Sequence, residues 1–238
     1  MAEERRGAER APLSRERVLH AAVALADASG ASGAEAFSMR RLAQELGVVP
    51  MALYKHVANK EELLDGMVDM VVGEIARPTT SADWKSAVRQ QILSARSVLL
   101  HHRWAARVIE SRTGPTPAVL AYLDSVIGTF RDGGLSADLT HHVMHALGSR
   151  LLGFSQELFD TGGAAPTPSP ATAGAAAADL ARAYPRVAEI AAAAAHDMDS
   201  AVGGGCDDQF EFEFALDLLL DGIERLHHRG WTSTSPST

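Results

Sequence analysis

The sequence predicts an all-α protein, with a small N-terminal helix-turn-helix domain and a larger helical body. Apolar residues recur at steps of three and four along most of the chain, whereas no alternation of apolar and polar residues persists as it would in a strand. Glycines and prolines separate the periodic stretches, as they do between helices. With 238 residues, 46% of them hydrophobic, the chain can bury a sizeable core.

The first helix is expected to begin after Ser14, because serine is a good N-cap residue and apolar residues follow it at helical spacing. Gly30 is expected to end this helix. The charged residues before it, 1–13, offer little apolar surface for packing, which predicts a disordered arm.

Two shorter helices are expected next. Ser38 can cap a second helix, which ends at Gly47. Pro50 suits the first position of a third helix, because proline lacks the amide hydrogen that would go unpaired there. This third helix can run only to about Val57. Together the three helices form an expected domain over residues 14–60.

The larger domain is expected over residues 61–238. Asn59 and Glu62 form a capping-box-like pair at the start of its first helix, and Pro78 ends that helix. Apolar periodicity then predicts a series of further helices. These lie at about 83–101, 104–112, 117–131 and 136–159.

The remainder of the chain is more varied in composition. Residues 161–174 are rich in Gly, Pro, Ser, Thr and Ala, which predicts a mobile loop. An alanine-rich helical region is expected at 175–195, interrupted at Pro185. The stretch "FEFEF" at 210–214 alternates like a strand, but its surroundings predict a helix over 208–226. The helical stripe consists of Phe212, Leu216, Leu219, Ile223 and Leu226.

This last helix carries apolar residues outside its main stripe. Leu218 and Leu220 add a second apolar surface. A helix that is apolar on two sides must be covered on two sides. The domain core is one cover, and a second subunit is the cover that we expect for the other.

Charge and cysteine content indicate the partners and the cellular compartment of the protein. The net charge is −8, yet residues 1–60 hold nine basic against seven acidic residues. The asymmetry suggests a small anion-facing domain on an acidic body. The single cysteine, Cys206, cannot form an internal disulfide, so we expect a cytoplasmic protein. No run of eighteen apolar residues and no signal peptide are found, which predicts no membrane partner.

The spacing of the second and third helices around a glycine turn is typical of a helix-turn-helix, whose second helix fits the major groove of DNA. The stretches "SMRRLAQELGV", "LYKHV" and "NKEEL" then resemble the N-terminal domain of the Tet-repressor (TetR) family of transcriptional regulators. The resemblance covers about residues 13–76. The downstream stretches "LLHHRWAARVIESRTGPTPAVLAYLDSVIGTFRDGGLS" and "DDQFEFEFALDLLLDGIERL" resemble, more loosely, the ligand-binding domain of the tetracycline-repressor branch.

The resemblance implies a ligand-responsive repressor that binds a near-palindromic, double-stranded operator as a homodimer. A small-molecule effector in the body would move the fourth helix and so release the DNA. The dimer would form through the helices near 136–159 and 208–226.

DNA-binding residues are expected in and around the third helix. Pro50, Met51 and Ala52 lead it, so they should meet base edges, where apolar groups can touch only a thymine methyl. Lys60 begins the fourth helix, where amides and the helix dipole attract a phosphate. From the residue type alone, Tyr54 is also explained as a packed aromatic and His56 as a surface histidine. The expected DNA-contacting set is Ser38, Arg40, Arg41, Pro50, Met51, Ala52, Tyr54, Lys55, His56 and Lys60.

Effector-binding residues are expected in the body. In the resembled branch, one histidine coordinates the drug-bound magnesium and a second histidine recognises the drug. The first position is Ile109 in this sequence, and the second falls near Glu74-Ile75. A ligand other than tetracycline is therefore expected, with no metal and no cofactor. The expected lining is Met67, Met70, Val71, His102, Trp104, Ile109, Tyr122, His145 and Phe154.

Two other interpretations of the sequence remain. A metal-dependent helical enzyme would use the histidine cluster of His101, His102, His141, His142 and His145. No acidic residue completes such a metal site in a matching motif, and no catalytic triad or phosphate-binding loop is found, so we expect no enzyme. A purely dimerising scaffold is the second alternative. It would leave the Arg, Tyr, His and Lys residues of the small domain unexplained.

Overall fold

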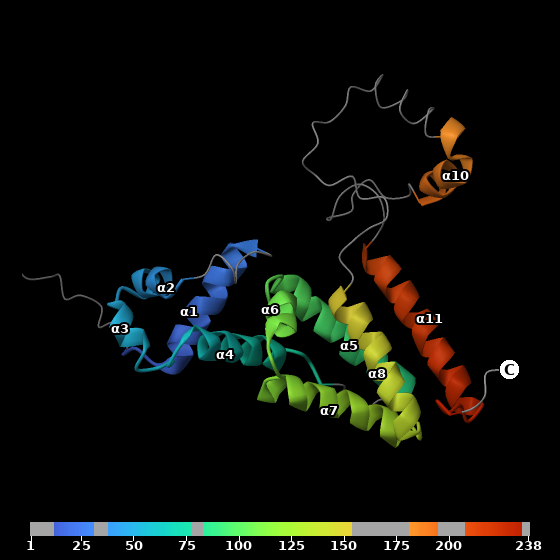
Figure 1. Ribbon diagram of the computed structural model, residues 1–238, viewed down its shortest axis with the longest axis horizontal. Helices are drawn as coiled ribbons and strands as arrows, with labels where there is room; N and C mark the ends of the chain where they lie inside the picture. The colour runs from blue at the N-terminus through green and yellow to red at the C-terminus, as the bar shows by residue number, and fades with distance from the viewer. Residues whose placement is uncertain (1–11, 31–37, 78–82, 154–180, 195–207, 235–238) are drawn as a thin grey trace, which may run out of the picture. The chain divides into compact units, whose positions relative to one another are not determined.

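The computed structural model describes residues 12–30, 38–77, 83–153, 181–194 and 208–234, and the elements in these ranges are helices (Figure 1). The predicted all-α class is confirmed. The expected arm at 1–13 falls almost wholly outside the described residues. The loop at 161–174 and the end of the helix at 136–159 also lie outside them.

The three N-terminal helices are α1 (Arg15–Ala28), α2 (Met39–Leu46) and α3 (Pro50–Leu53). Their caps agree with the sequence prediction. The Ser14 hydroxyl accepts from the Arg17 amide at 3.1 Å, and Gly47 ends α2 in the left-handed conformation, with φ at 66°. The third helix is shorter than predicted, because it ends at Leu53 and a turn continues to Val57, whose amide bonds to the Leu53 carbonyl at 3.0 Å.

The fourth helix, α4 (Lys60–Gly73), begins as predicted but ends early. The Asn59 side chain accepts from the Glu62 amide at 2.8 Å, while the Glu62 carboxylate accepts from the amide of Ala58, not from that of Asn59. The helix ends at Gly73 with Glu74 as its C-cap, so Pro78 does not end it. The capping motif is therefore shifted by one residue.

Three helices of the body pack with α4: α5 (Trp84–His101), α6 (Ala105–Ser111) and α7 (Pro117–Asp132). The helix α4 contacts α1, α5, α6 and α7. One apolar core runs from Val18 of α1 through Met67 of α4 to Trp104 and Val108 near α6. The N-terminal helices and the start of the body therefore share a core, and α4 belongs to both.

The chain divides into two compact units, Met1–His141 and His142–Thr238. The division falls within α8 (Ala137–Gly153), whereas the sequence placed a domain boundary between residues 60 and 61. The second unit holds the rest of α8, α10 (Pro185–Ala194) and α11 (Asp208–His228). No helix within the described ranges is long and apolar enough to cross a membrane.

The stretch "FEFEF" lies within α11, which confirms the helical interpretation over the strand. Leu220 is 1% exposed and joins the buried face of α11, so its assignment to a second apolar surface was wrong. The exposed apolar residues are instead Phe210, Phe214 and Leu218, spaced by four. On the buried side, Arg150 of α8 lies 4.9 Å from the Phe212 ring centroid and donates to the Glu211 carbonyl at 2.9 Å.

Candidate nucleic-acid interface and ligand cavity

The N-terminus of α3 is exposed on the first unit. Val49 and Met51 are 68% and 73% exposed, whereas Leu53 is fully buried and anchors the helix. The turn before α3 depends on the positive φ of Gly47, a conformation that side-chain-bearing residues rarely adopt. The structure thus presents the first turn of α3 to solvent. Pro50 is exposed there and Ala52 half-buried.

Basic and aromatic side chains surround this exposed turn. Residues 38–60 contain four basic residues and a single acidic one, Glu45. Tyr54 is 44% exposed and His56 is half-buried. Arg40, Arg41 and Lys55 are exposed. The structure therefore brings most of the predicted DNA-contacting set to one small domain.

Ser38 and Lys60 have structural surroundings of their own. The Ser38 hydroxyl caps α2 by accepting from the Arg41 amide at 3.2 Å. Lys60 is half-buried at the first position of α4. One carboxylate oxygen of Glu62 accepts a hydrogen bond from the Ala58 amide near this helix end. The other carboxylate oxygen lies 3.7 Å from the Arg15 guanidinium. DNA contacts by Ser38 and Lys60, like those by the rest of the set, remain predictions.

Polar contacts that the sequence did not predict tie α4 to the helices beyond it. Arg112, at the end of α6, pairs with Glu61 and lies 3.0 Å from Asp65. Asp69 accepts from the Ala118 amide at 3.0 Å and so caps the start of α7. A spacing of four between Glu61, Asp65 and Asp69 shows that they share a face of α4. The spacing does not reveal which helix that face contacts.

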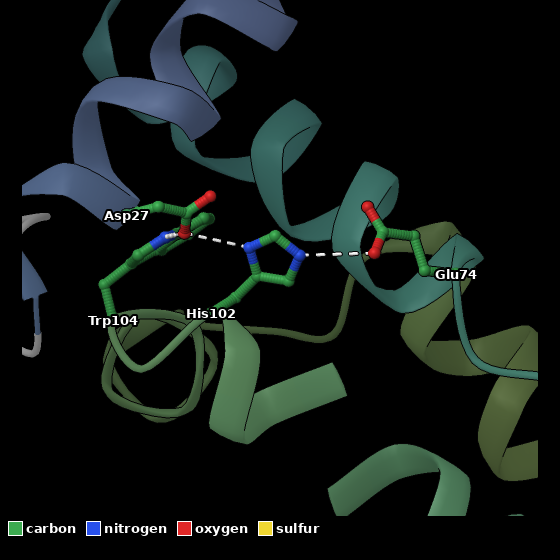
Figure 2. Close-up of polar contacts among 4 residues, drawn as sticks. All are labelled: Asp27, Glu74, His102 and Trp104. Carbon is green, nitrogen blue, oxygen red and sulfur yellow. Dashed lines mark hydrogen bonds and ion pairs between the residues drawn. The ribbon is translucent and has the colours of Figure 1, made fainter. Parts of the chain in front are cut away.

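A second polar cluster joins three helices (Figure 2). The His102 Nδ1 lies 2.8 Å from Asp27 Oδ1, and its Nε2 lies 3.2 Å from Glu74 Oε2. The Trp104 indole donates to the same Asp27 oxygen at 2.7 Å. His102 and Trp104 were predicted to line the effector site. In the structure their polar atoms face these carboxylates.

A cavity of about 230 Å³ lies where the end of α4 meets α5 and α7. The Tyr122 hydroxyl is buried and makes no hydrogen bond with the described residues. Burial raises the pKa of Tyr122, so the phenol stays protonated. Gln91 and Ser125 also line the cavity, with the Gln91 amide donating to Ser125 Oγ at 3.0 Å. The cavity thus offers the Tyr122 O–H, which donates to none of the described residues, beside the hydrogen-bonded side chains of Gln91 and Ser125.

Of the nine residues predicted to bind the effector, Tyr122 lines this cavity. Others belong to the apolar core: Met67, Val71 and Trp104 are fully buried there, and Met70 and Ile109 pack against it. His145 is exposed in the second unit, and Phe154 lies outside the described residues. Apolar periodicity could not separate cavity-lining residues from core residues, because both face inward. The missed lining includes Val72, Gly73, Ile75, Ala118 and Ala121.

The predicted histidine cluster shows no metal geometry. Within the ranges that the structure describes, no three His, Cys, Asp or Glu side chains are arranged to hold a metal ion. His142 instead meets the Trp231 ring edge-on, with 5.5 Å between ring centroids.

Two family models match the chain. The model described as "Bacterial regulatory proteins, tetR family" matches residues 18–67, and "Tetracyclin repressor-like, C-terminal domain" matches residues 77–227. The first match ends within α4, and the second spans most of the body. Together they cover both parts of the predicted organisation.

The curated relatives are transcriptional regulators, and neither they nor the family models support the metal-dependent enzyme. The HTH-type transcriptional repressor DrrR1 of Streptomyces coeruleorubidus is 36% identical over 126 residues, which is 52% of this chain and 46% of the relative. The class E tetracycline repressor of Escherichia coli is 28% identical over 146 residues, covering 60% of this chain and 67% of the relative. The match spans only about half the length of the first relative.

Solved structures extend the similarity to nearly the whole chain. The Streptomyces coelicolor TetR family protein ActR in complex with (S)-DNPA has a TM-score of 0.67 and 27% identity, covering 91% of this chain and 100% of ActR. ActR in complex with actinorhodin has a TM-score of 0.63 and 28% identity, covering 90% of this chain and 98% of ActR.

Proposed function

Because this chain belongs to the TetR family of bacterial regulatory proteins, we propose that it is a ligand-responsive transcriptional repressor. It binds a near-palindromic operator as a homodimer in the cytoplasm, and a small-molecule effector releases it. The observation that carries DNA binding is the exposed first turn of α3, flanked by Arg40, Arg41 and Lys55. A short helix presented in this way fits the major groove, while cations beside it meet phosphates.

Base recognition follows from the residues at the start of α3. The side chains of Pro50, Met51 and Ala52 carry no donor or acceptor that could form bidentate hydrogen bonds with a base edge. They can contact thymine methyl groups, so specificity depends on those methyls, on Lys55 and on DNA shape. Tyr54, His56, Lys60 and Ser38 add contacts to the phosphate backbone.

The effector binds in the cavity at the end of α4. A volume of about 230 Å³ is below the roughly 300–1,000 Å³ of typical ligand pockets, so the cavity admits a compact ligand or part of a larger one. The buried Tyr122 hydroxyl can donate to a carbonyl or phenol oxygen of the ligand. The bound structures of ActR, with (S)-DNPA and with actinorhodin, support a small-molecule effector.

The helix α4 connects the two sites. Val72 and Gly73 at its end line the cavity, and Lys60 at its start lies beside the DNA-binding residues. A ligand that displaces the end of α4 therefore acts on the DNA-binding helices through one rigid element.

The homodimer forms through α8 and α11. Phe210, Phe214 and Leu218 of α11 expose an apolar stripe of 52–61% relative exposure. Exposed apolar stripes of this kind are typical of interfaces between subunits. The symmetric pairing of two copies also matches a palindromic operator.

Binding to a labelled duplex from upstream of the protein's own gene tests the proposal. We expect saturable binding at low salt, with an affinity that falls linearly in log–log form as salt rises. A scrambled duplex of equal length is the control. A thermal-shift screen should identify compounds that stabilise the protein, and these should also release the duplex. If no duplex from the gene's neighbourhood binds at low salt, the proposal is wrong.

A further inference from the structure

We propose that His102 is a positioning residue that holds the end of α4 against α1, and that it does so fully only when its ring is protonated. The operator-binding consequence of this role rests on the function proposed above. The stability consequence does not.

The location of His102 makes it a junction between the DNA-binding helices and the cavity. It is the C-cap of α5, 3% exposed, with Trp104 opening α6 two residues later. Asp27 is the penultimate residue of α1, and Glu74 is the C-cap of α4; both face the His102 ring (Figure 2). Glu74 lies between Gly73 and Ile75, which line the cavity. One imidazole therefore bridges the end of an N-terminal helix and the end of the helix that borders the cavity.

The chemistry of the bridge depends on protonation. Ionised carboxylates accept hydrogen bonds but donate none. The two contacts, 2.8 Å from Nδ1 to Asp27 and 3.2 Å from Nε2 to Glu74, can both be hydrogen bonds only if both ring nitrogens carry protons. A neutral imidazole has one N–H and one lone pair, so it must give up one contact.

The contact to Glu74 is the one given up. It is the longer of the two, and the Glu74 side chain is 52% exposed against 27% for Asp27. Water can therefore replace His102 at Glu74 more easily than at Asp27. The titratable groups lying against the ring are Asp27, Glu74 and His101, whose ring meets His102 edge-on at 4.6 Å between centroids.

The contact with Glu74 requires a proton on both ring nitrogens, so acid pH favours this contact and alkaline pH removes it. The end of α4 is then freed from α1 at higher pH. Operator binding should weaken, because the DNA-binding helices are less firmly placed.

Double-mutant cycles on the full-length protein test the bridge itself. Glu74→Ala and His102→Gln are combined, and urea unfolding is followed at about pH 6 and about pH 8.5, on either side of histidine titration. We expect a His102–Glu74 coupling of about fivefold in the unfolding equilibrium constant at the lower pH and none at the higher. A parallel cycle with Asp27→Ala should show coupling at both. Equal His102–Glu74 coupling at the two pH values, or no coupling at the lower pH, overturns the proposal.

Operator binding tests the positioning role. His20→Gln combined with His56→Gln serves as the background, because both histidines lie in the expected DNA-binding domain over residues 14–60. In this background we expect affinity to fall about fivefold between the two pH values, in keeping with the coupling. Adding Glu74→Gln should remove the pH dependence, since a neutral amide can pair with either form of the ring. An unchanged pH dependence with Glu74→Gln overturns the role. Absence of any operator binding would instead contradict the proposed function and leave the unfolding cycles to decide the bridge.

Discussion

At the residue scale, single polar groups link the local backbone to the surface expected to meet DNA. The Ser38 hydroxyl accepts a hydrogen bond from the backbone amide of Arg41, three residues on, at the start of α2. A cap of this kind typically contributes about 1 kcal/mol to stability. Ser38 thus has a structural role whether or not its hydroxyl also touches a phosphate.

Replacing Lys60 with alanine should weaken operator binding evenly across sequences. A phosphate contact carries no base information, and its loss should reduce the slope of log affinity against log salt by roughly one unit. Binding isotherms over a salt series measure this slope. Lys85→Ala, on α5 outside the DNA-binding domain, is the matched control and should leave the slope unchanged. An unchanged slope with Lys60→Ala would remove Lys60 from the phosphate-contacting set.

Replacing Tyr122 with phenylalanine should leave the free protein as stable or more stable, by up to about 1 kcal/mol, because the buried hydroxyl bonds to none of the described residues. Effector binding should weaken, because the cavity loses the phenol O–H that donates to the ligand. Urea unfolding and a thermal-shift titration measure the two effects. Tyr184→Phe, at a 62% exposed residue, is the control and should change neither. A loss of stability with normal effector binding would show that the hydroxyl serves the fold.

At the scale of elements, close packing between helices depends on where a helix lacks a side chain. A Cβ built on Gly66 of α4 would approach the Leu19 side chain of α1 to 2.7 Å. At the end of α7, a Cβ on Gly133 would lie 2.6 Å from Trp84, whose ring packs against Phe130 at 5.6 Å between centroids. Glycine at these positions lets neighbouring helices approach.

Gly128 of α7 and Gly133, the C-cap of that helix, should respond to alanine in opposite directions. Gly133→Ala should destabilise the protein by about 1–3 kcal/mol, because its methyl group would overlap the Trp84 ring. Gly128→Ala, inside α7, should stabilise it by about 0.5–1 kcal/mol, because no neighbouring atom of the described residues lies within 4 Å of the new Cβ. Urea unfolding at one protein concentration measures both. Equal effects of the two changes would contradict the packing seen at Trp84.

At the scale of the whole molecule, the two faces of α11 differ in what covers them. Phe212, Leu216 and Leu220 are buried within the chain, whereas Phe214 and Leu218 are more than half exposed. Phe210 and Phe214 stack on one another at 6.4 Å, which keeps their rings on one side of the helix. The proposed homodimer would cover this stripe with the same stripe of a second copy across a two-fold axis.

Replacing Leu218 with glutamate should disrupt the dimer and leave the subunit folded. The side chain is 55% exposed in the single chain, so a charge there costs little in the monomer but is unpaired in an apolar interface. Sedimentation velocity and circular dichroism measure assembly and helicity. Leu120→Glu on α7, at a residue 52% exposed, is the matched control and should stay dimeric. A dimer that persists in Leu218→Glu would place the interface elsewhere.

The sequence determined the helices and the DNA-binding domain to a large extent. N-caps such as Ser14 and Asn59 act over three residues, and the left-handed Gly47 acts over one turn, so these signals can be read locally. Helical ends depended more on context. The helix α4 stops at Gly73 although its apolar pattern continues to Ile75, because the amides of Glu74 and Ile75 donate to carbonyls three residues back, at Val71 and Val72, instead of four.

The tertiary structure alone decided which inward-facing residues meet one another. The sequence predicted that Met67, Trp104 and Tyr122 line the effector site, but the first two are core residues and only the third lines the cavity. The bridge from Asp27 through His102 to Glu74 joins residues separated by 75 and 28 positions in the chain. A helical repeat specifies the face on which a side chain lies. Which helix covers that face, and whether a void remains between them, depends on the packing of all the helices together.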